Sequence, residues 1–401
     1  MYMKLTPKQQ QAMKLAIDWF KNDNKRPFVL SGVAGSGKTF TANKIIEAFN
    51  LYPENVKFVT FTGMAAGVIT RRGQMATTIH RLIYIPIVKN NKVTFMKREY
   101  LDPNIKLIVV DEISMVGEDL FKDIQSFGIP ILTLGDSAQL PPVNRKAVKF
   151  LDKPDIFLDE PVRQSLDNPI INIANMVRNK QELPMGKFAD NVYVLNPNQI
   201  DNSFLELADQ ILVSYNNSAS QINNKYRREI LNINSETPSV GDKIICLRNN
   251  WDVSIFENNI QQYLTNGLIG TIKNINKDND KTQATLFDFM PEYFDNEYYK
   301  NILFDNLVFD GTIERTEDLY ELQKNDKHLK SIFKKRMVYE STTGKKVMPF
   351  NYAYAITIHK SQGSEYDNVL LYDQVTRGDR FRALYTGITR AKENLVIIKD
   401  R

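Results

Sequence analysis

The chain has 401 residues, which at roughly 150 residues per domain corresponds to two or three domains and excludes a small peptide scaffold. Hydrophobic residues make up 42% and charged residues 25% of a chain with only 18 Gly and 16 Pro, so collagen-like and low-complexity classes are excluded. The only cysteine is Cys246 and the only histidines are His80, His328 and His359, which excludes an intrachain disulfide framework and a Cys-rich zinc module. Lys and Arg (52) exceed Asp and Glu (47) by five, an excess that permits a polyanionic partner without requiring one.

The N-terminal segment, residues 1–20, gives no sign of a targeting signal. It mixes apolar residues with Lys, Gln and Asp, whereas a signal peptide has a charged start and an apolar core. No stretch approaches the ~18 consecutive apolar residues of a membrane span. The sequence therefore predicts a cytoplasmic protein with no membrane association.

Short apolar runs alternate with helical patterns in the first third of the chain, which is typical of β-α units on a parallel sheet. We expect strands at 28–30, 56–60, 105–110 and 129–134, and a helix at 39–49. The last two strands end at Asp111-Glu112 and Gly135-Asp136. Because open α/β sheets bind ligands at the carboxyl ends of their strands, these clusters indicate a single site.

Residues 82–103 interrupt this pattern. Two short β-like runs, 84–88 and 92–96, are joined at Lys89-Asn90-Asn91, where Asn tolerates left-handed backbone. We therefore predict a hairpin inserted in the first α/β domain.

A second α/β region follows, interrupted by a β-rich segment. It is predicted to contain a helix at 168–179, a strand at 211–214, a helix after Ser218, and strands at 369–372 and 395–398. The β-like runs without intervening helices lie at 243–247, 268–273, 284–289 and 302–309. They predict a small β subdomain that continues through a basic helical stretch at 327–336.

Residues 32–39, Gly-Val-Ala-Gly-Ser-Gly-Lys-Thr, match the phosphate-loop pattern between a predicted strand and a predicted helix. The glycines let backbone N–H groups turn toward a phosphate, and the helix N-terminus adds positive potential. Lys38 is suited to the β- and γ-phosphates and the Thr39 hydroxyl to Mg²⁺. The alternative, a Gly-rich turn without a ligand, is disfavoured by the strand-helix context. The predicted ATP-binding residues of this loop are Gly32, Ala34, Gly35, Ser36, Gly37, Lys38, Thr39 and Phe40.

Adjacent carboxylates follow the third predicted strand. We expect Asp111 to hold Mg²⁺ through water and Glu112 to position and deprotonate the attacking water. The alternative is an acidic helix N-cap, which is weakened by the presence of Lys38 upstream. Gln139, after the next strand, is suited to sensing a γ-phosphate, although a run of this type is by itself more typical of a turn.

The ordered motifs of this sequence resemble those of superfamily 1 helicases, and most closely those of the RecD and Dda branch, whose members typically move 5′ to 3′ on single-stranded DNA. The motifs are Gln9, GVAGSGKT at 32–39, FTGMAA at 61–66, TTIH at 77–80, DEIS at 111–114, GDSAQLPPV at 135–143, VRQS at 162–165, TIHKSQGSEYD at 357–367 and LYTGITRAKENL at 384–395. The resemblance implies an α/β fold: two RecA-like motor domains with parallel sheets, a hairpin inserted in the first and a small β-barrel-like insertion in the second.

The resemblance also implies roles at the nucleotide. Gln9 is expected to contact adenine, and Gly363 and Glu365 are expected near the ribose and phosphates. Arg163 and Arg390 are the implied arginine fingers, since a guanidinium stabilises phosphate charge in the transition state. For an arginine outside such a motif, a surface salt bridge is the usual reading.

A second set of roles concerns DNA. The residues implied to contact it are Thr62, Gly63, His80, Thr357 and His359. The hairpin resembles a strand-separating pin, with Phe95 or Tyr84 as candidates for stacking on a base. Packing of these aromatics onto their own domain is an equally expected alternative.

The basic run consists of Lys327, Lys330, Lys334, Lys335 and Arg336. It either follows a phosphate backbone or, as we favour, forms a solvated helix face.

The resemblance divides the chain into four parts. The first motor domain is expected at 1–83 and 104–165 with the hairpin at 84–103, and the second at 166–267 and 347–401 with the β insertion at 268–346. The long N-terminal domain through which RecD joins its partner subunits is not expected, because Gln9 lies almost at the start. We therefore expect a self-sufficient motor that acts as a monomer.

The predicted function is that of an ATP-dependent DNA helicase that uses ATP and Mg²⁺ and acts on single-stranded and forked duplex DNA in replication, repair or recombination. Single-stranded-DNA-binding or replication proteins are expected as further partners, and the compact Dda-like layout suggests a viral origin and a location in host cytoplasm. One alternative is a non-motor module in which nucleotide switches nucleic-acid binding, although a switch has less need of a complete hydrolytic set. Another is a helicase that acts mainly on RNA.

Overall fold

The computed structural model describes residues 5–89, 92–143, 145–161, 168–235, 237–257, 260–279, 283–294, 296–309 and 326–399. The chain divides into two units. Unit 1 comprises residues 1–201, 207–214 and 361–401, and unit 2 comprises residues 202–206 and 215–360. None of the described helices combines the length and the apolar character needed to cross a membrane.

The first sheet of unit 1 is parallel and contains the four strands predicted for the β-α units of the first third of the chain. Its order is β3-β2-β6-β7-β1-β8. The strands are β1 (Phe28–Gly32), β2 (Val56–Thr60), β3 (Ala76–Thr78), β6 (Leu107–Val110), β7 (Ile131–Gly135) and β8 (Ile156–Leu158). The expected mixed α/β class with a parallel sheet is therefore confirmed.

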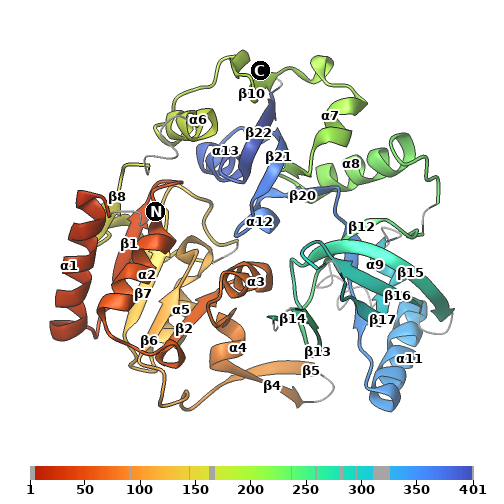
Figure 1. Ribbon diagram of the computed structural model, residues 1–401. Coiled ribbons are helices and arrows are strands. Elements are labelled where there is room, and N and C mark those ends of the chain that lie inside the picture. The colour runs from red at the N-terminus through yellow and green to blue at the C-terminus, as the bar shows by residue number, and fades with distance from the viewer. Residues whose placement is uncertain are drawn as a thin grey trace. The chain divides into compact units, whose positions relative to one another are not determined.

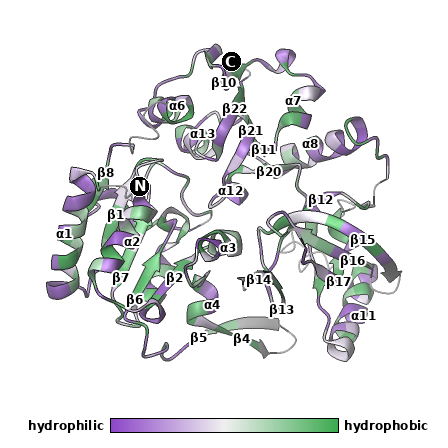
Figure 2. Cartoon of the chain, viewed as in Figure 1, coloured by the Kyte–Doolittle hydropathy of each residue, from purple (hydrophilic) through white to green (hydrophobic). Residues whose placement is uncertain are grey.

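Helices cover both faces of this sheet (Figure 1). They are α1 (Pro7–Asn22), α2 (Lys38–Ala48), α3 (Gly63–Arg71), α4 (Ile79–Ile83) and α5 (Glu118–Gln125), with 3-10 turns η1 (Pro53–Asn55), η2 (Ile113–Met115) and η3 (Lys149–Asp152). Alternate residues of β1 point to opposite faces, so Phe28 packs with Trp19 of α1 while Val29 packs with Ile124 of α5. Figure 2 shows β6 and β7 as largely hydrophobic, as expected for strands buried on both faces.

The predicted hairpin is present as β4 (Tyr84–Lys89) and β5 (Lys92–Lys97), which pair antiparallel and follow α4 (Figure 1). Residues 90 and 91, at the predicted turn, lie outside the described residues. The Tyr84 hydroxyl donates a hydrogen bond to Asp123 of α5. One end of the hairpin is thereby attached to the first domain.

Within unit 1, the strands of the second sheet lie in the order β11-β21-β22-β10-β9. Its strands are β9 (Gly186–Ala189), β10 (Val192–Leu195), β11 (Gln210–Val213), β21 (Tyr366–Tyr372) and β22 (Ala391–Ile398), of which β9 is antiparallel to its neighbour and the others pair in parallel. The helices of this part are α6 (Pro169–Arg178) and α13 (Arg380–Ile388), with the 3-10 turn η5 (Pro197–Gln199). The start of α6 is fixed by Asn168, whose side chain accepts from the Ile170 N–H at 2.9 Å.

Unit 2 is built on a six-stranded sheet of order β18-β17-β16-β15-β12-β19. The strands are β12 (Lys243–Cys246), β15 (Ile269–Asn279), β16 (Ala284–Pro291), β17 (Tyr299–Asp305), β18 (Val347–Met348) and β19 (Phe350–Tyr352), and a separate hairpin pairs β13 (Asn250–Glu257) with β14 (Ile260–Leu264). Phe287 lies at the centre of its core, with its ring edge-on to those of Phe304 and Phe350. In the sequence, this sheet begins at Lys243, before segment 268–346, and ends at Tyr352, after it.

The remaining elements of unit 2 are α7 (Asn202–Leu207), which unit 2 shares with unit 1, α8 (Asn216–Glu229), α9 (Asn306–Phe309), α11 (Lys327–Thr343), β20 (Ala355–Thr357) and α12 (Ile358–Ser361). The predicted strand at 302–309 is wrong in its second half. The Asp305 carboxylate accepts from the Leu307 N–H at 3.0 Å, which turns the chain into α9. The helix expected after Ser218 begins earlier, at Asn216.

The prediction of a solvated basic face at 327–336 is wrong for Arg336. This side chain is 4% exposed and donates two hydrogen bonds to Asp305, at 2.7 and 2.8 Å, and a third to the carbonyl of Gln283 at 2.9 Å. Arg336 therefore fixes α11 to the sheet. The four lysines of the run are exposed, so the solvated face consists of Lys327, Lys330, Lys334 and Lys335.

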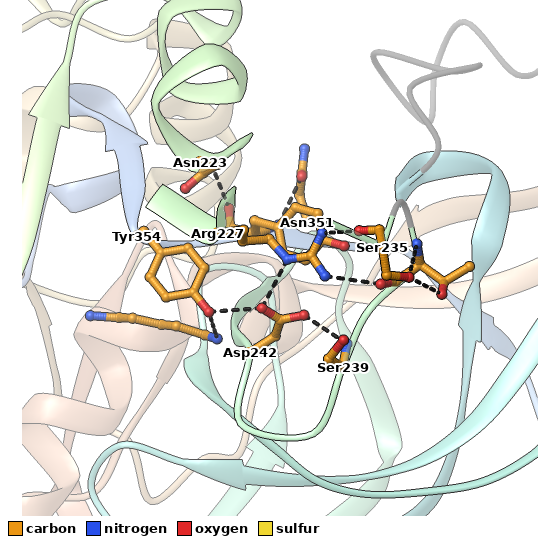
Figure 3. Close-up of polar contacts among 10 residues, drawn as sticks. Asn223, Arg227, Ser235, Ser239, Asp242, Asn351 and Tyr354 are labelled. Atoms are coloured by element: carbon orange, nitrogen blue, oxygen red, sulfur yellow. Dashed lines mark hydrogen bonds and ion pairs between the residues drawn. The ribbon is translucent and has the colours of Figure 1, made fainter. Parts of the chain in front are cut away.

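A second buried arginine, Arg227 of α8, fixes that helix to the segment that leads into β12 (Figure 3). Its Nε donates to Asp242 at 3.0 Å, and its terminal nitrogens donate to the carbonyls of Ser235 at 2.6 Å and Thr237 at 2.9 Å. The Tyr354 hydroxyl donates to the same carboxylate at 2.8 Å and accepts from the Lys243 N–H at 3.1 Å. Because the arginine and the carboxylate are both buried, this is a paired charge inside unit 2.

Asn223, one turn earlier in α8, holds the chain before β20 (Figure 3). Its Nδ2 donates to the carbonyls of Tyr352 at 3.1 Å and Ala355 at 3.0 Å, and its Oδ1 accepts from the Ala355 N–H at 2.7 Å. The backbone that leads to Thr357 is thereby fixed to α8.

Candidate functional site

The loop between β1 and α2 has the backbone shape of a phosphate cradle. Gly35 and Gly37 have φ angles of 73° and 76°, in the left-handed region that favours glycine. A Cβ on Gly32 would lie 2.7 Å from Ser36 Oγ and 2.8 Å from the Leu158 carbonyl oxygen, so only glycine fits there. The helix that follows begins at Lys38 and directs its first N–H groups toward the loop.

The side chains predicted to contact nucleotide lie on this loop and the first turn of α2. Lys38 Nζ donates to the carbonyls of Gly32 and Val33, both at 3.0 Å. Thr39 and Phe40 follow in the first helical turn and are partly buried. Lys38 therefore lies across the loop, with its ammonium group held by backbone oxygens.

Gln9 is brought to the same loop from α1. It is 2% exposed, its Nε2 donates to the Ser36 carbonyl at 3.1 Å, and its Oε1 accepts from the Thr6 N–H at 3.0 Å. Both ends of the amide are thus engaged with the chain in this conformation. The structure places Gln9 against the loop.

Asp111 and Glu112 follow β6, which is separated from β1 by β7 alone. The Glu112 N–H donates to Asp111 Oδ1 at 2.8 Å, and Glu112 has a φ angle of 51°, which is unusual for a residue with a side chain. Burial and the neighbouring Glu112 carboxylate raise the pKa of Asp111 to about 6, and Lys38 and Arg72 act in the opposite direction. The two carboxylates therefore form a region of concentrated negative charge within electrostatic range of Lys38.

Gln139 and Asp136 follow β7, between β6 and β1. Gln139 is 6% exposed, and its Oε1 is buried and accepts no hydrogen bond from the described part of the chain. Asp136 is fully buried. An unpaired acceptor at this edge of the sheet is suited to a donor that belongs to a ligand, such as water.

These residues fit ATP with Mg²⁺. The described residues include no group of three or more His, Cys, Asp or Glu side chains placed to hold a metal ion, so they provide no cage built from protein alone. Magnesium sites in nucleotide enzymes need only one or two protein ligands, with phosphate oxygens and water completing the octahedron. The Thr39 hydroxyl and the Asp111 carboxylate are of the required type, and the raised pKa of Asp111 reports a charge that a cation would stabilise.

Two of the residues predicted to act at the nucleotide, Arg390 and Gly363, belong to the second α/β part of unit 1. The Arg390 side chain donates to the carbonyls of Thr386 and Ser364, both at 3.1 Å, and to the Thr389 hydroxyl at 3.0 Å. Gly363 has a φ angle of 83°, and a Cβ on it would lie 2.6 Å from the Cβ of Ala65 in α3. The Arg390 guanidinium is therefore held by neutral oxygens, which leaves its charge available to an anion.

Glu365 and Arg163 are the two remaining residues predicted to act at the nucleotide. The Glu365 side chain is 55% exposed, with its carboxylate 3.9 Å from the guanidinium of Arg72. Arg163, the other predicted arginine finger, lies outside the described residues.

Of the residues predicted to contact DNA, Thr62, Gly63, His80 and Phe95 lie in unit 1. Thr62 caps α3 by accepting from the Ala65 N–H at 3.3 Å, and Gly63 is the buried first residue of that helix. Burial and Arg145 lower the pKa of His80, which favours the neutral imidazole. Phe95 of β5 is 60% exposed.

Thr357 and His359 lie in unit 2. Thr357 ends β20 and is 7% exposed, and His359 lies in the short helix α12. The structure thus distributes the predicted DNA residues over both units.

Three residues near the loop were not assigned a role from the sequence: Tyr385, Asp136 and Arg178. The Tyr385 hydroxyl donates to Asp136 Oδ2 and accepts from the Ala34 N–H at 3.0 Å. Arg178 lies 3.5 Å from Asp136 Oδ1 and stacks on Phe157. The available signal was Asp136 itself, because a carboxylate that directly follows a buried strand requires a partner.

Comparison with known proteins identifies two matching family models. Residues 14–145 match a family described as an AAA domain, and residues 352–398 match the UvrD-like helicase C-terminal domain. The first match contains the phosphate loop, the Asp111-Glu112 pair and Gln139. The second contains Thr357, His359 and Arg390.

The chain is also similar to curated proteins of known name. The ATP-dependent RecD2 DNA helicase of Deinococcus radiodurans is 32% identical over 161 residues, which cover 37% of this chain and 21% of that protein. The RecBCD enzyme subunit RecD of Buchnera aphidicola is 26% identical over 363 residues, which cover 81% of this chain and 58% of that protein. The chain thus spans less than two thirds of either relative.

Among solved structures, the Pif1 helicase from Bacteroides in complex with ADP-AlF3 and ssDNA is 18% identical, with a TM-score of 0.55 over 100% of this chain and 94% of that one. A structure described as showing DNA unwinding at forked dsDNA by two coordinating Pif1 helicases is 19% identical, with a TM-score of 0.55 over 100% and 92%. At this level of identity the likeness concerns the fold. It supports the expected pair of RecA-like domains.

Proposed function

We propose that this chain, which belongs to the RecD- and Pif1-like helicases of superfamily 1, is an ATP-dependent motor that moves 5′ to 3′ along single-stranded DNA and unwinds duplexes at a fork. The observation that carries this proposal lies at one edge of the first sheet. There, a phosphate loop, two adjacent carboxylates and a buried glutamine whose Oε1 accepts no hydrogen bond from the described residues come together. These groups are the ones that nucleotide hydrolysis requires.

ATP is proposed to bind with its phosphates on the loop. The backbone N–H groups of residues 32–39 and the Lys38 ammonium group bind the phosphate oxygens, and Gln9 faces the base. Thr39 and Asp111 hold Mg²⁺, which neutralises phosphate charge when bound. Gly363 and Glu365 lie on the segment proposed to face the ribose and phosphates.

Hydrolysis is proposed to depend on Glu112, Gln139 and two arginines. Glu112 accepts the proton of the attacking water, and Gln139 orients that water through its buried Oε1. Arg390 stabilises charge on the transferred phosphoryl group, together with Arg163. Because the Arg390 donors are held by neutral oxygens among the described residues, its guanidinium can exchange these contacts for phosphate oxygens without breaking an ion pair in that part of the chain.

DNA is proposed to contact both units, through Thr62, Gly63 and His80 in unit 1 and Thr357 and His359 in unit 2. The hairpin β4–β5 is proposed as the strand-separating pin, since Phe95 exposes most of its ring. We propose that the chain acts as a monomer, with the domain division predicted from the sequence, in DNA replication, repair or recombination. Single-stranded-DNA-binding or replication proteins are the proposed partners, in the cytoplasm of a cell or of a viral host.

The deciding experiment is steady-state ATP hydrolysis with and without single-stranded DNA, with single-stranded RNA in parallel. We expect strong stimulation by DNA and loss of turnover in Lys38→Ala, which should retain the circular dichroism spectrum of the wild type. Equal or greater stimulation by RNA would assign the substrate to RNA. Nucleotide binding without turnover on either polymer would favour a nucleotide-switched binding module instead.

The direction of movement requires a separate test. Duplexes with a 5′ tail or a 3′ tail of equal length and sequence composition should differ, and only the 5′-tailed substrate should be unwound. Preferential unwinding of the 3′-tailed duplex would contradict the proposed polarity while leaving the motor assignment intact.

A further inference from the structure

Tyr385 joins the phosphate loop to the helix that leads to Arg390. Its side chain is 1% exposed and lies in α13, five residues before the proposed arginine finger. The hydroxyl accepts from the Ala34 N–H at 3.0 Å and donates to the buried carboxylate of Asp136. One hydroxyl group therefore connects the phosphate loop, the segment after β7 and α13.

The next residue extends this connection in both directions. The Thr386 hydroxyl accepts from the Leu140 N–H at 2.9 Å, next to Gln139. The Thr386 carbonyl accepts from Arg390 Nε at 3.1 Å. Hydrogen bonds thus run from the loop and from segment 136–140 to α13, and from α13 to the guanidinium.

The Asp136 carboxylate lies at the centre of these hydrogen bonds and is itself held in place by its neighbours. Asp136 Oδ1 accepts from the Ala138 N–H at 3.0 Å and lies 3.5 Å from Arg178. Burial and Asp136 raise the pKa of Tyr385 above its ordinary value, so its hydroxyl remains a donor at physiological pH. Because a charge-assisted hydrogen bond is short and directional, it restricts the distance between α13 and the segment after β7.

We propose that Tyr385 is a positioning residue that couples the phosphate loop to Arg390. In this role, its hydroxyl fixes α13 against the loop at the distance from which the guanidinium reaches the γ-phosphate. The inference rests on the proposed function, because it assigns a means of control to the same nucleotide site. Tyr385 itself needs no contact with the nucleotide.

The structure supplies a matched control in unit 2. The Tyr354 hydroxyl makes the same two kinds of hydrogen bond, one to a buried carboxylate (Asp242) and one from a backbone N–H (Lys243). Tyr354→Phe removes the same groups as Tyr385→Phe, at a position with no proposed contact to nucleotide. A loss of packing or stability affects both variants, whereas a loss of positioning affects Tyr385→Phe alone.

The test measures DNA-free ATP turnover, as kcat and KM, in the wild type, in both tyrosine variants and in Arg390→Ala. For Tyr385→Phe we expect kcat to fall about tenfold or more with KM for ATP within about threefold, because misplacement of a catalytic group affects the chemical step. For Tyr354→Phe we expect wild-type kcat at a temperature where it is folded. Wild-type kcat in Tyr385→Phe, or an equal fall in both variants, would overturn the proposal.

A double variant tests whether the effect passes through Arg390. If it does, Tyr385→Phe in the Arg390→Ala background should change kcat by less than about twofold, since the group it positions is already absent. Losses that multiply in full would overturn the proposed coupling.

Asp136→Asn, which leaves the tyrosine intact, is judged by the same criteria if Tyr385→Phe does not fold. Absence of wild-type turnover both with and without single-stranded DNA would overturn the proposed function together with this inference, whereas wild-type turnover with an unaffected Tyr385→Phe overturns the inference alone.

Discussion

The partly buried Asp111 at the nucleotide edge of unit 1 differs from the buried carboxylates in the interior of unit 2 in the groups that surround it. In unit 2, Asp242 and Asp305 are each paired with a buried arginine, which also donates to backbone carbonyls. In unit 1, Asp111 lies beside Glu112, and burial together with this neighbour raises its pKa to about 6. The difference shows where the chain retains negative charge for a ligand and where it neutralises charge to stabilise the fold.

The largest expected effect is at Glu112. Glu112→Gln preserves the size and the unusual backbone conformation of this residue but removes the proton acceptor. We expect kcat for ATP to fall by roughly 10²- to 10³-fold, because a positioned general base contributes about that factor. ATP affinity, measured by fluorescence titration with a labelled nucleotide, should change little. Retention of more than about a tenth of the wild-type kcat would show that Glu112 is not the base.

A comparable amide substitution in unit 2 should affect stability instead. Asp242→Asn leaves Arg227 buried without its carboxylate, and we expect the free energy of unfolding to fall by about 3 kcal/mol. Urea denaturation followed by circular dichroism measures this change. Asp252→Asn is the control, because its ion pair with Lys346 is exposed and should contribute less than about 0.5 kcal/mol. Equal effects at the two positions would contradict the structural role of the buried pair.

At Asp111 the same substitution should have the opposite sign. The pKa in the folded chain, about 6, lies above the ordinary value of 3.8, so the folded state binds the proton more tightly than the unfolded state. Ionisation therefore costs stability, which is lost as the pH rises from about 4 through about 6. Asp111→Asn removes this cost, and we expect it to raise the free energy of unfolding by roughly 1–2 kcal/mol at pH 8, allowing for partial exposure.

The measurement at Asp111 is denaturation in EDTA, without nucleotide, at pH 8 and at pH 5. The gain from Asp111→Asn should shrink at pH 5, where the wild-type carboxyl is largely protonated. ATP turnover should nevertheless be lost in this variant, since an amide is a poorer magnesium ligand than a carboxylate. A variant less stable than the wild type at pH 8 would show that the carboxylate stabilises the fold.

Features of unit 1 that are determined by residues close together in the sequence were predictable from it. The pattern of apolar runs placed β2 at Val56–Thr60 without error, and the spacing of glycines and Lys38 located the phosphate loop. Predictions from the local sequence were wrong where a residue far away in the sequence determines whether a side chain is buried. Arg336 belongs to a basic run but is buried because Asp305, 31 positions away, pairs with it.

The polar connections between residues far apart in the sequence were the least predictable. Tyr385 and Asp136 are separated by 249 positions, and Tyr354 and Asp242 by 112. A tyrosine in an apolar run is consistent with simple packing, so no local pattern distinguishes a bridging hydroxyl from an ordinary core residue. Such residues become visible only when the fold brings their partners together.

The hairpin β4–β5 also combines a side chain that is held by the fold with one that is left exposed. Substitution of the exposed one has the smallest expected effect. The hydroxyl of Tyr84 is bound to the Asp123 carboxylate, whereas Phe95 on the neighbouring strand is 60% exposed. Phe95→Ala should weaken binding of single-stranded DNA about fivefold, or about 1 kcal/mol, because stacking on one base contributes at least this much. Fluorescence anisotropy with a labelled oligonucleotide measures the affinity, and DNA-free ATP turnover should stay unchanged.

Tyr84→Phe is the companion variant. Since it removes the hydroxyl that attaches the hairpin to α5 and retains the ring, it should reduce unwinding more than binding. If Tyr84→Phe weakened binding and Phe95→Ala did not, the two aromatics would exchange roles, with Tyr84 meeting the DNA and Phe95 stabilising the hairpin.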